Sequence, residues 1–116
     1  MFDFEKLEVY NKAREYHRSI WQLVQECLPG QVQRNQLLRA SLSIVLNIAE
    51  GAGRFTNPDK RNFYIIARGS VYECVALLDV ILDQQLLSSS KHCELYSLSE
   101  EISKMLYAMI RNLSGK

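Results

Sequence analysis

The chain has 116 residues, 47% of them hydrophobic and 23% charged, and its formal net charge is +1. These values predict one globular domain over residues 1–116 and argue against a disordered chain. The uncharged run from Ala40 to Ala49 is too short to cross a bilayer, which takes about 20 residues. The opening MFDFEKLEVY also lacks the features of a secretory signal. We therefore expect a cytoplasmic location and no membrane partner.

The three cysteines, Cys27, Cys74 and Cys93, are widely spaced and include no C-x-x-C pair. This pattern argues against a disulfide framework and against a zinc site, so reduced thiols are expected. Cys27 and Cys74 fall on apolar helix faces, where cysteine behaves as a small hydrophobe. Cys93 lies near a predicted helix start, but the sequence arranges no base for it. We expect no catalytic residue, no metal and no cofactor.

Two prolines and five glycines fall between segments with helical periodicity, so the sequence predicts helices and no strands. The first predicted helix runs from Phe4 to Cys27, with Asp3 as its N-cap, and Pro29 and Gly30 end it. Its apolar positions recur every three or four residues and are Leu7, Tyr10, Ala13, His17, Ile20, Val24 and Cys27.

The second predicted helix runs from about Arg34 to Glu50. Gly51 and Gly53 follow it as stop signals, because a glycine adopts a positive φ at little cost. The apolar positions of this helix are Leu37, Leu38, Leu42, Ile44, Val45, Ile48 and Ala49.

The third predicted helix runs from about Pro58 to Gln85, with Asn57 as its N-cap and Asp59 in its first turn. Its main apolar stripe consists of Phe63, Ile66, Ala67, Ser70, Cys74, Leu77 and Ile81. A second stripe beside it consists of Tyr64, Val71, Val75, Leu78 and Leu82. A helix that is apolar over most of its circumference needs neighbours on most sides, so the two stripes predict a homo-oligomer.

The last predicted helix runs from about Lys91 to Asn112, with Ser90 as its N-cap after a short polar turn. Its apolar stripe consists of Leu95, Leu98, Ile102, Met105, Met109 and Leu113. Four helices of similar length joined by short loops predict an all-α fold, an up-down-up-down antiparallel four-helix bundle.

Polar residues on the facing sides of the second and third predicted helices suggest a hydrogen-bonded cluster. Its predicted members are Asn47, Glu50, Ser70 and Glu73, closed by Arg39 or Arg54. The alternative is a metal site, for which helical bundles use Glu-x-x-His pairs, and this chain contains no such pair. We therefore interpret the cluster as structural. The glycines of G-A-G-R follow a helix and lack the phosphate-loop pattern, which makes nucleotide binding a weak interpretation.

The segment from residue 34 to residue 68 is locally basic, with six basic residues against Glu50 and Asp59, a local charge of +4. The basic residues are Arg34, Arg39, Arg54, Lys60, Arg61 and Arg68. They form either a phosphate-binding surface or a solvated surface with ion pairs. Likewise, Phe55 and Tyr64 either stack on unpaired bases beside these cations or pack within the protein.

Several motifs together resemble one protein family. They are N-I-A-E-G-x-G-R at residues 47–54, A-x-G-S-x-x-E at residues 67–73, R-A-S-x-S-I at residues 39–44 and the opening F-x-x-L-x-V-x-x-K-A at residues 4–13. In combination they resemble the bacterial four-helix bundle proteins associated with intervening sequences in 23S ribosomal RNA genes. The family usually has proline where this chain has Val45, so a straighter second helix is expected here.

The resemblance implies a homo-oligomeric, pentameric bundle, similar to the accessory protein of diversity-generating retroelements, which works with a reverse transcriptase and nucleic acid. It carries over no catalytic residue. The leading hypothesis is therefore a non-enzymatic oligomeric bundle that binds RNA or a nucleoprotein partner through the six basic residues. The alternative is a protein–protein interaction scaffold without nucleic-acid binding.

Overall fold

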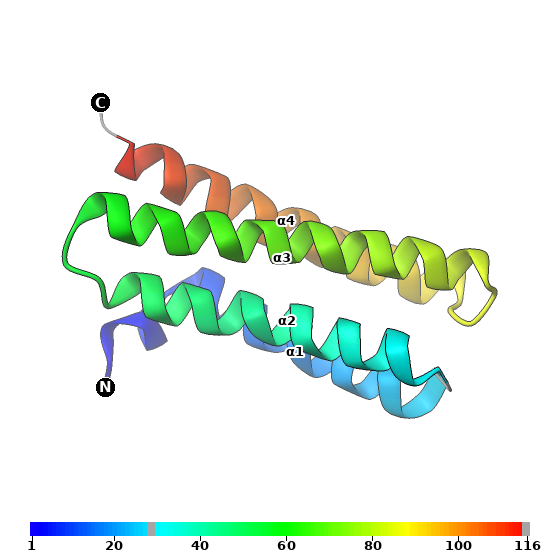
Figure 1. The fold of residues 1–116 in the computed structure, drawn as a ribbon. Coiled ribbons are helices and arrows are strands. Elements are labelled where there is room, and N and C mark those ends of the chain that lie inside the picture. Colours follow the sequence, from blue (N-terminus) through cyan, green and yellow to red (C-terminus); the bar gives the residue numbers. More distant parts are fainter. Residues whose placement is uncertain (28–29, 115–116) are drawn as a thin grey trace.

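The computed structural model describes residues 1–27 and 30–114. Within these ranges the chain forms four α-helices, α1 (Glu8–Cys27), α2 (Gln31–Ala52), α3 (Asn57–Asp83) and α4 (Ser89–Leu113), preceded by a short 3-10 helix, η1 (Asp3–Lys6). Successive helices run in opposite directions along a bundle that is 45 Å long (Figure 1). The predicted four-helix bundle is confirmed. None of the helices in the described ranges combines the length and apolar character that a membrane span requires.

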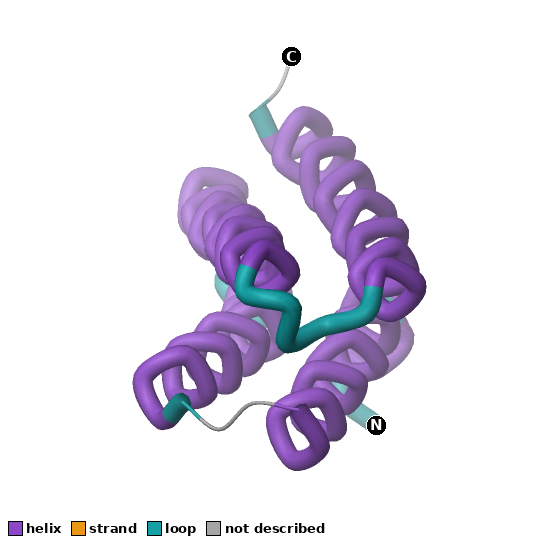
Figure 2. The backbone as a smooth tube through the Cα atoms, turned by 90° about the vertical axis from the view of Figure 1, so that its right-hand side faces the viewer, coloured by secondary structure: helices purple, strands orange, loops and turns teal. Residues whose placement is uncertain are grey.

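Each helix packs against its two neighbours around the bundle, α1 on α2, α2 on α3, α3 on α4 and α4 on α1. Figure 2 shows this arrangement from the side of the α3–α4 connection. The start of the chain, the α2–α3 loop and the end of α4 lie at one end of the bundle, whereas the α3–α4 loop and the start of α2 lie at the opposite end (Figure 1). The α2–α3 loop is therefore remote from the first turn of α2.

The predicted start of the first helix is wrong, because the helix is interrupted at Leu7. Leu7 has extended backbone angles (φ −74°, ψ 128°), so η1 and α1 are separate helices. Asp3 does not act as the N-cap. Instead, the backbone N–H of Phe2 donates to Glu5 Oε1 at 2.8 Å. The side-chain amide of Asn11 donates to the carbonyl oxygens of Glu5 (3.1 Å) and Leu7 (3.2 Å), which holds the break in place.

Two predicted N-caps are also displaced along the chain. The hydroxyl of Thr56, not the side chain of Asn57, caps α3 by accepting from the N–H of Asp59 at 3.3 Å. Ser88, not Ser90, caps α4. In each case the capping residue has an extended ψ of 151°, and this backbone geometry selects the cap among adjacent polar residues.

Of the two glycines predicted to end the second helix, Gly53 is the C-cap of α2, whereas Gly51 lies inside the helix. The helix continues through Gly51 to Ala52, and the C-cap Gly53 has a φ of −87°, so neither glycine is needed for a positive φ. Gly51 is buried against α3, where a Cβ would lie 2.8 Å from Tyr64 Cε1. The absence of a side chain at Gly51 therefore lets the two helices approach closely.

Both predicted apolar stripes of α3 contribute to the core. Tyr64, Val71 and Leu78 of the second stripe are almost fully buried, as are Ala67 and Cys74 of the main stripe. This happens because α3 packs against both α2 and α4, so its buried arc is wide enough for two stripes. The second stripe is consequently not the exposed surface from which self-association was predicted.

The core also contains a hydroxyl pair at mid-bundle. Tyr16 of α1 and Ser99 of α4 are both almost fully buried, and their hydroxyl oxygens are 2.9 Å apart. Ser99 Oγ also lies 2.8 Å from the carbonyl oxygen of Leu95. Among the described residues, every fully buried side-chain nitrogen or oxygen has a hydrogen-bond partner. The pair therefore joins α1 to α4 without an unsatisfied polar group.

Candidate functional site

Part of the predicted polar cluster is a short hydrogen-bond chain between α2 and α3. The hydroxyl of Ser70 lies 2.9 Å from the hydroxyl of Ser43. The side-chain amide of Asn47 donates to Ser43 twice, to its carbonyl oxygen at 2.9 Å and to its hydroxyl at 3.0 Å. All three side chains satisfy one another across the helix contact, which is a structural arrangement and not a reactive one.

The two predicted carboxylates form separate ion pairs on the surface. Glu73 accepts from the guanidinium of Arg39 at 2.8 Å, which links α3 to α2. Glu50 accepts from Arg54 at 3.4 Å, within the last turn of α2 and the following loop. The structure brings neither carboxylate into the serine–asparagine chain. Each carboxylate is paired with a cation and remains partly solvated. The two carboxylates therefore do not resemble an acid–base or metal site.

Two of the predicted basic residues at the α2–α3 loop contact their own chain. The guanidinium carbon of Arg54 lies 4.5 Å from the centre of the Phe63 ring, in a cation–π arrangement. Lys60 Nζ donates to the carbonyl oxygen of Ala52 at 2.8 Å, which satisfies a free carbonyl at the end of α2. Both cations thus stabilise the turn into α3.

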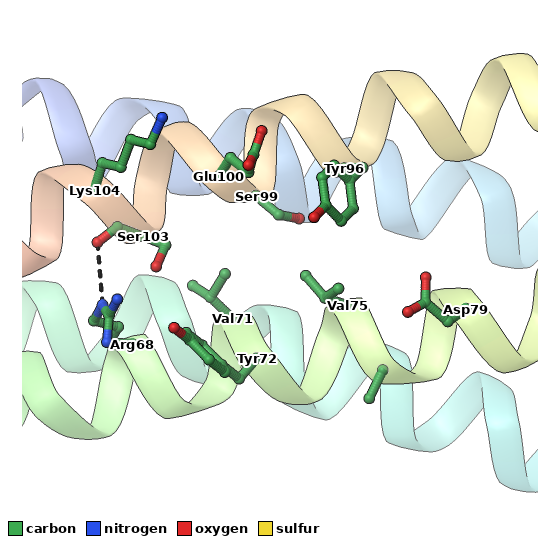
Figure 3. Close-up of a pocket in the computed structure, with 11 residues that line it drawn as sticks. Arg68, Val71, Tyr72, Val75, Asp79, Tyr96, Ser99, Glu100, Ser103 and Lys104 are labelled. Atoms are coloured by element: carbon green, nitrogen blue, oxygen red, sulfur yellow. Dashed lines mark hydrogen bonds between the residues drawn. The ribbon is translucent and has the colours of Figure 1, made fainter.

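Arg68 is bound between α3 and α4. Its Nε donates to the carbonyl oxygen of Ser103 at 3.2 Å, shown as a dashed line in Figure 3. Its guanidinium carbon also lies 5.0 Å from the ring centre of Tyr72 and 5.4 Å from that of Tyr107. This side chain therefore joins two helices and two aromatic rings.

The six predicted basic residues do not form one patch. Arg34 lies in the first turn of α2, near the end of α3, where the side chains of Gln33 and Gln84 are hydrogen-bonded at 2.8 Å. Arg61 lies near the start of α3, at the opposite end of the bundle. The local charge of +4 is therefore spread along the length of the molecule and does not converge on one site.

A groove of about 450 Å³ lies between α3 and α4 (Figure 3). Val71 and Val75 contribute apolar surface to it, and Tyr72 and Tyr96 stand at its sides. Its charged residues have both signs and are Arg68, Asp79, Glu100 and Lys104. The groove combines apolar and aromatic surface with balanced charge, which suits a protein contact better than a small anionic substrate.

A second groove, of about 380 Å³, lies between α1 and α2 and was not predicted from the sequence. The residues that line it are Tyr10, Arg14, His17, Arg18, Trp21 and Val45. His17 Nδ1 lies 2.7 Å from the hydroxyl of Ser41, and burial lowers the pKa of His17 below its usual value. The signal was present in the sequence as a Tyr, Arg, His, Arg and Trp series on one side of the first helix.

The thiols and carboxylates of the described residues do not assemble into a metal site, since no three His, Cys, Asp or Glu side chains gather there. Cys74 is buried, and burial raises the pKa of its thiol to about 12. A thiol with such a pKa is inert at neutral pH. Cys93 is exposed on α4, whereas the side chain of Cys27 lies outside the described residues.

Comparison with known families confirms the resemblance. The family described as 23S rRNA-intervening sequence protein matches residues 5–108. The chain belongs to this family. The crystal structure, at 1.70 Å resolution, of a protein of unknown function from the S23 ribosomal protein family of Bacteroides thetaiotaomicron VPI-5482 is similar. It shares 24% sequence identity, 88% of this chain and 97% of that chain are covered, and the TM-score is 0.82. No match was found among curated proteins.

The motifs that marked this 23S rRNA-intervening sequence protein can now be placed in the fold. Asn47 and Ser70 take part in the hydrogen-bond chain between α2 and α3, and Gly51 lies against the side chains of Phe63 and Tyr64 of α3. Arg54 and Glu73 lie in surface ion pairs near the same hairpin. These residues have structural contacts that explain their identity without a bound ligand.

Proposed function

We propose that this chain is a non-enzymatic helical bundle that associates with copies of itself and acts as a protein–protein interaction scaffold. The observation that carries the proposal is the solvent-exposed side of α3, here called the α3 outer line. Apolar or small residues occupy this line, namely Ile65, Ile66, Gly69, Tyr72, Ala76 and Val80. In an isolated bundle the corresponding side of a helix is usually polar.

The spacing of the α3 outer line supports a contact with another molecule. Ile65 and Ile66 are adjacent, and from Ile66 onward the members recur three or four residues apart, so they form one ridge along the helix. Ile66 exposes 45% of its surface and Tyr72 exposes 58%. A Cβ at Gly69 would meet no atom within 4 Å. An exposed glycine inside a helix costs about 0.5–1 kcal/mol relative to alanine, and the close approach of a second chain would offset that cost.

The contacts of the basic residues favour the scaffold over RNA binding as the main proposal. Arg39, Arg54, Lys60 and Arg68 each bond to a group of their own chain. A phosphate ligand would have to compete with these contacts. Neither the family description nor the similar crystal structure names an enzymatic activity. These observations support a binding function without catalysis.

Light scattering of the purified chain at tens of micromolar tests self-association. We expect an oligomer, and the family resemblance proposes five copies. Ile66→Glu places a charge on the α3 outer line and should shift the molecular mass toward that of a monomer. Ser97→Glu places the same charge at an exposed position on α4 and serves as the matched control. A monomer for the unaltered chain would refute the proposal.

RNA or nucleoprotein binding is the second candidate, and one observation favours it. Phe55 in the α2–α3 loop is fully exposed, at 101% of its reference surface, and Arg54, Lys60 and Arg61 surround it in the sequence. An exposed aromatic ring beside cations suits an unpaired base and its phosphates. Electrophoretic mobility with ribosomal RNA fragments tests this candidate, because phosphate binding must weaken steeply as salt rises. Binding that does not change with salt would exclude it.

A further inference from the structure

We infer that the groove between α1 and α2 binds a segment of single-stranded nucleic acid, with a base stacked on Trp21 and phosphates held by Arg14 and Arg18. None of these three residues is among the six basic positions predicted from the sequence. The inference rests on the RNA-binding candidate above and assigns it a different site. Four features of the groove carry it.

The first feature is the alignment of the aromatic and basic residues. Tyr10, Arg14, Arg18 and Trp21 are spaced 4, 4 and 3 residues apart, so they lie along one side of α1. Adjacent turns place the two arginines about 6 Å apart along the helix axis. A flexible strand running along the helix can therefore contact both cations and the indole in succession.

The second feature is the separation of charge around α1. Among the described residues, neither Arg14 nor Arg18 has a carboxylate within ion-pair distance. Lys12 forms a 3.0 Å ion pair with Glu101 of α4, which raises the pKa of Lys12. The nearby carboxylate of Glu15 raises this pKa further. Glu8 and Glu15 of α1 thus lie near Lys12, on the side that faces Glu101 of α4, and the side with Arg14 and Arg18 carries a positive charge that attracts phosphate.

The third feature is the availability of the indole. Trp21 exposes 51% of its surface although it lines a groove. The other aromatic ring of the groove, Tyr10, is occupied by an edge contact with Phe4, with ring centres 4.9 Å apart. Trp21 is therefore the platform on which a base can stack, and such stacking tolerates every base.

The fourth feature is the rest of the groove lining. Val45 of α2, which is almost fully buried, adds apolar lining to the groove, and His17 adds an imidazole. The hydrogen bond to Ser41 occupies His17 Nδ1, so Nε2 is the ring nitrogen that can meet a ligand. A base edge or a sugar hydroxyl can bond to this nitrogen while the base contacts apolar surface.

The chain contains one tryptophan, so its intrinsic fluorescence reports on this groove alone. Titration with a short single-stranded oligouridylate at low salt should quench the fluorescence of Trp21, and added salt should reverse the quenching. Dextran sulfate, a polyanion without bases, should displace the oligonucleotide without quenching the indole. Equal quenching by dextran sulfate would show a charge effect only and would overturn the stacking assignment.

Anisotropy of a labelled oligouridylate measures affinity in the variants. Trp21→Ala should weaken binding by about 5- to 150-fold, the range that corresponds to loss of one stacked base, and Trp21→Phe should restore part of it. Arg14→Ala combined with Arg18→Ala should weaken binding and flatten its salt dependence. The matched control combines Lys104→Ala with Arg111→Ala, which removes the same charge from α4, and should bind like the unaltered chain.

The remaining outcomes relate this inference to the RNA-binding candidate and to the scaffold proposal. RNA binding that survives Arg14→Ala with Arg18→Ala but is lost with Lys60→Ala and Arg61→Ala would overturn the groove assignment and leave RNA binding at the α2–α3 loop. No RNA binding at any salt would overturn the inference together with the RNA-binding candidate and would leave the scaffold proposal standing. A change of Trp21 fluorescence on dilution without RNA would identify the groove as a contact between copies and would also overturn the assignment.

Discussion

Gly51 of α2 lies against Tyr64 of α3 so closely that a Cβ on the glycine would stand 2.8 Å from Tyr64 Cε1. The same Cβ would stand 2.9 Å from Cβ of Phe63, which belongs to the preceding residue of α3. Tyr64 itself is 4% exposed, so its ring has little room to move. Helix packing, and not turn formation, therefore explains why glycine occupies this position in the family motif.

Gly51→Ala should destabilise the folded chain by about 1–3 kcal/mol, the usual cost of forcing extra atoms into a packed core. Urea denaturation followed by circular dichroism measures this change. The matched control is Gly53→Ala, two residues further along. A Cβ at Gly53 would lie 3.6 Å from the carbonyl oxygen of Glu50, an ordinary contact, and its φ of −87° suits alanine. Equal destabilisation by both variants would contradict the packing role of Gly51.

Glu73→Ala should cost less stability than Ser70→Ala. Glu73 pairs with Arg39 at the surface, with exposed side-chain fractions of 40% and 66%, and such pairs contribute about 0.2–1 kcal/mol. Ser70 is buried, and its loss leaves the hydroxyl of Ser43 with one partner fewer, which costs about 1–3 kcal/mol. Chemical denaturation of both variants, and of the double variant Arg39→Ala with Glu73→Ala, measures these changes in the free energy of unfolding. The reverse order would assign Glu73 a larger structural role.

Stability should fall as the pH rises above about 9, because two buried acids of the core resist ionisation. Burial raises the pKa of Cys74 to about 12, and burial together with the Cys74 thiol raises the pKa of Tyr16 far above its usual value. In the unfolded chain these groups ionise near their usual values of about 8.5 and 10. The unfolded state therefore loses protons first, and each group removes up to about 1.4 kcal/mol per pH unit above its unfolded pKa.

Thermal denaturation between pH 8 and pH 11 measures this alkaline loss. Tyr16→Phe removes the phenol and should flatten the dependence above pH 10, whereas Cys74→Ala should flatten it from about pH 9. An unchanged slope in both variants would show that other groups cause the loss.

Acidification should also destabilise the chain, through His17. Burial lowers the pKa of His17 in the folded state, so the unfolded chain takes up a proton first as the pH falls below the usual value of about 6.5. The stability that depends on neutral His17 is thus present above pH 6.5 and lost below it. Denaturation at pH 7 and pH 5 should show this loss in the unaltered chain and a smaller loss in His17→Gln. An equal loss in both would assign the acid effect to the carboxylates.

The fold was predictable because its signals are local. Helix periodicity, the Pro29–Gly30 break and the Asn57–Pro58 start define four helices of similar length, and short loops between them leave an antiparallel bundle as the simplest arrangement. The N-caps of α3 and α4 were predicted wrongly because adjacent polar residues compete for the capping position. Thr56 and Ser88 act as caps because the packed helices determine where the backbone becomes extended.

The sites were less predictable because charge and exposure depend on neighbours from other helices. From the sequence, Arg39 and Arg68 belong to one basic segment, but the first is paired with Glu73 and the second is bound between α3 and α4. Conversely, Trp21 and Arg14 lie on one side of α1 in the sequence pattern, but only the packing of α2 places Val45 with them in one groove.

The amino-acid sequence by itself determined the helices, the bundle and the family, because periodicity, helix breakers and residue motifs are properties of the chain alone. Only the tertiary structure decided that both stripes of α3 contribute to the core while Ile66 of the main stripe is exposed, that Gly51 sets a helix contact and that the basic residues are dispersed. The physical reason is that burial and pairing arise between side chains far apart in sequence, and helix packing determines which of them meet.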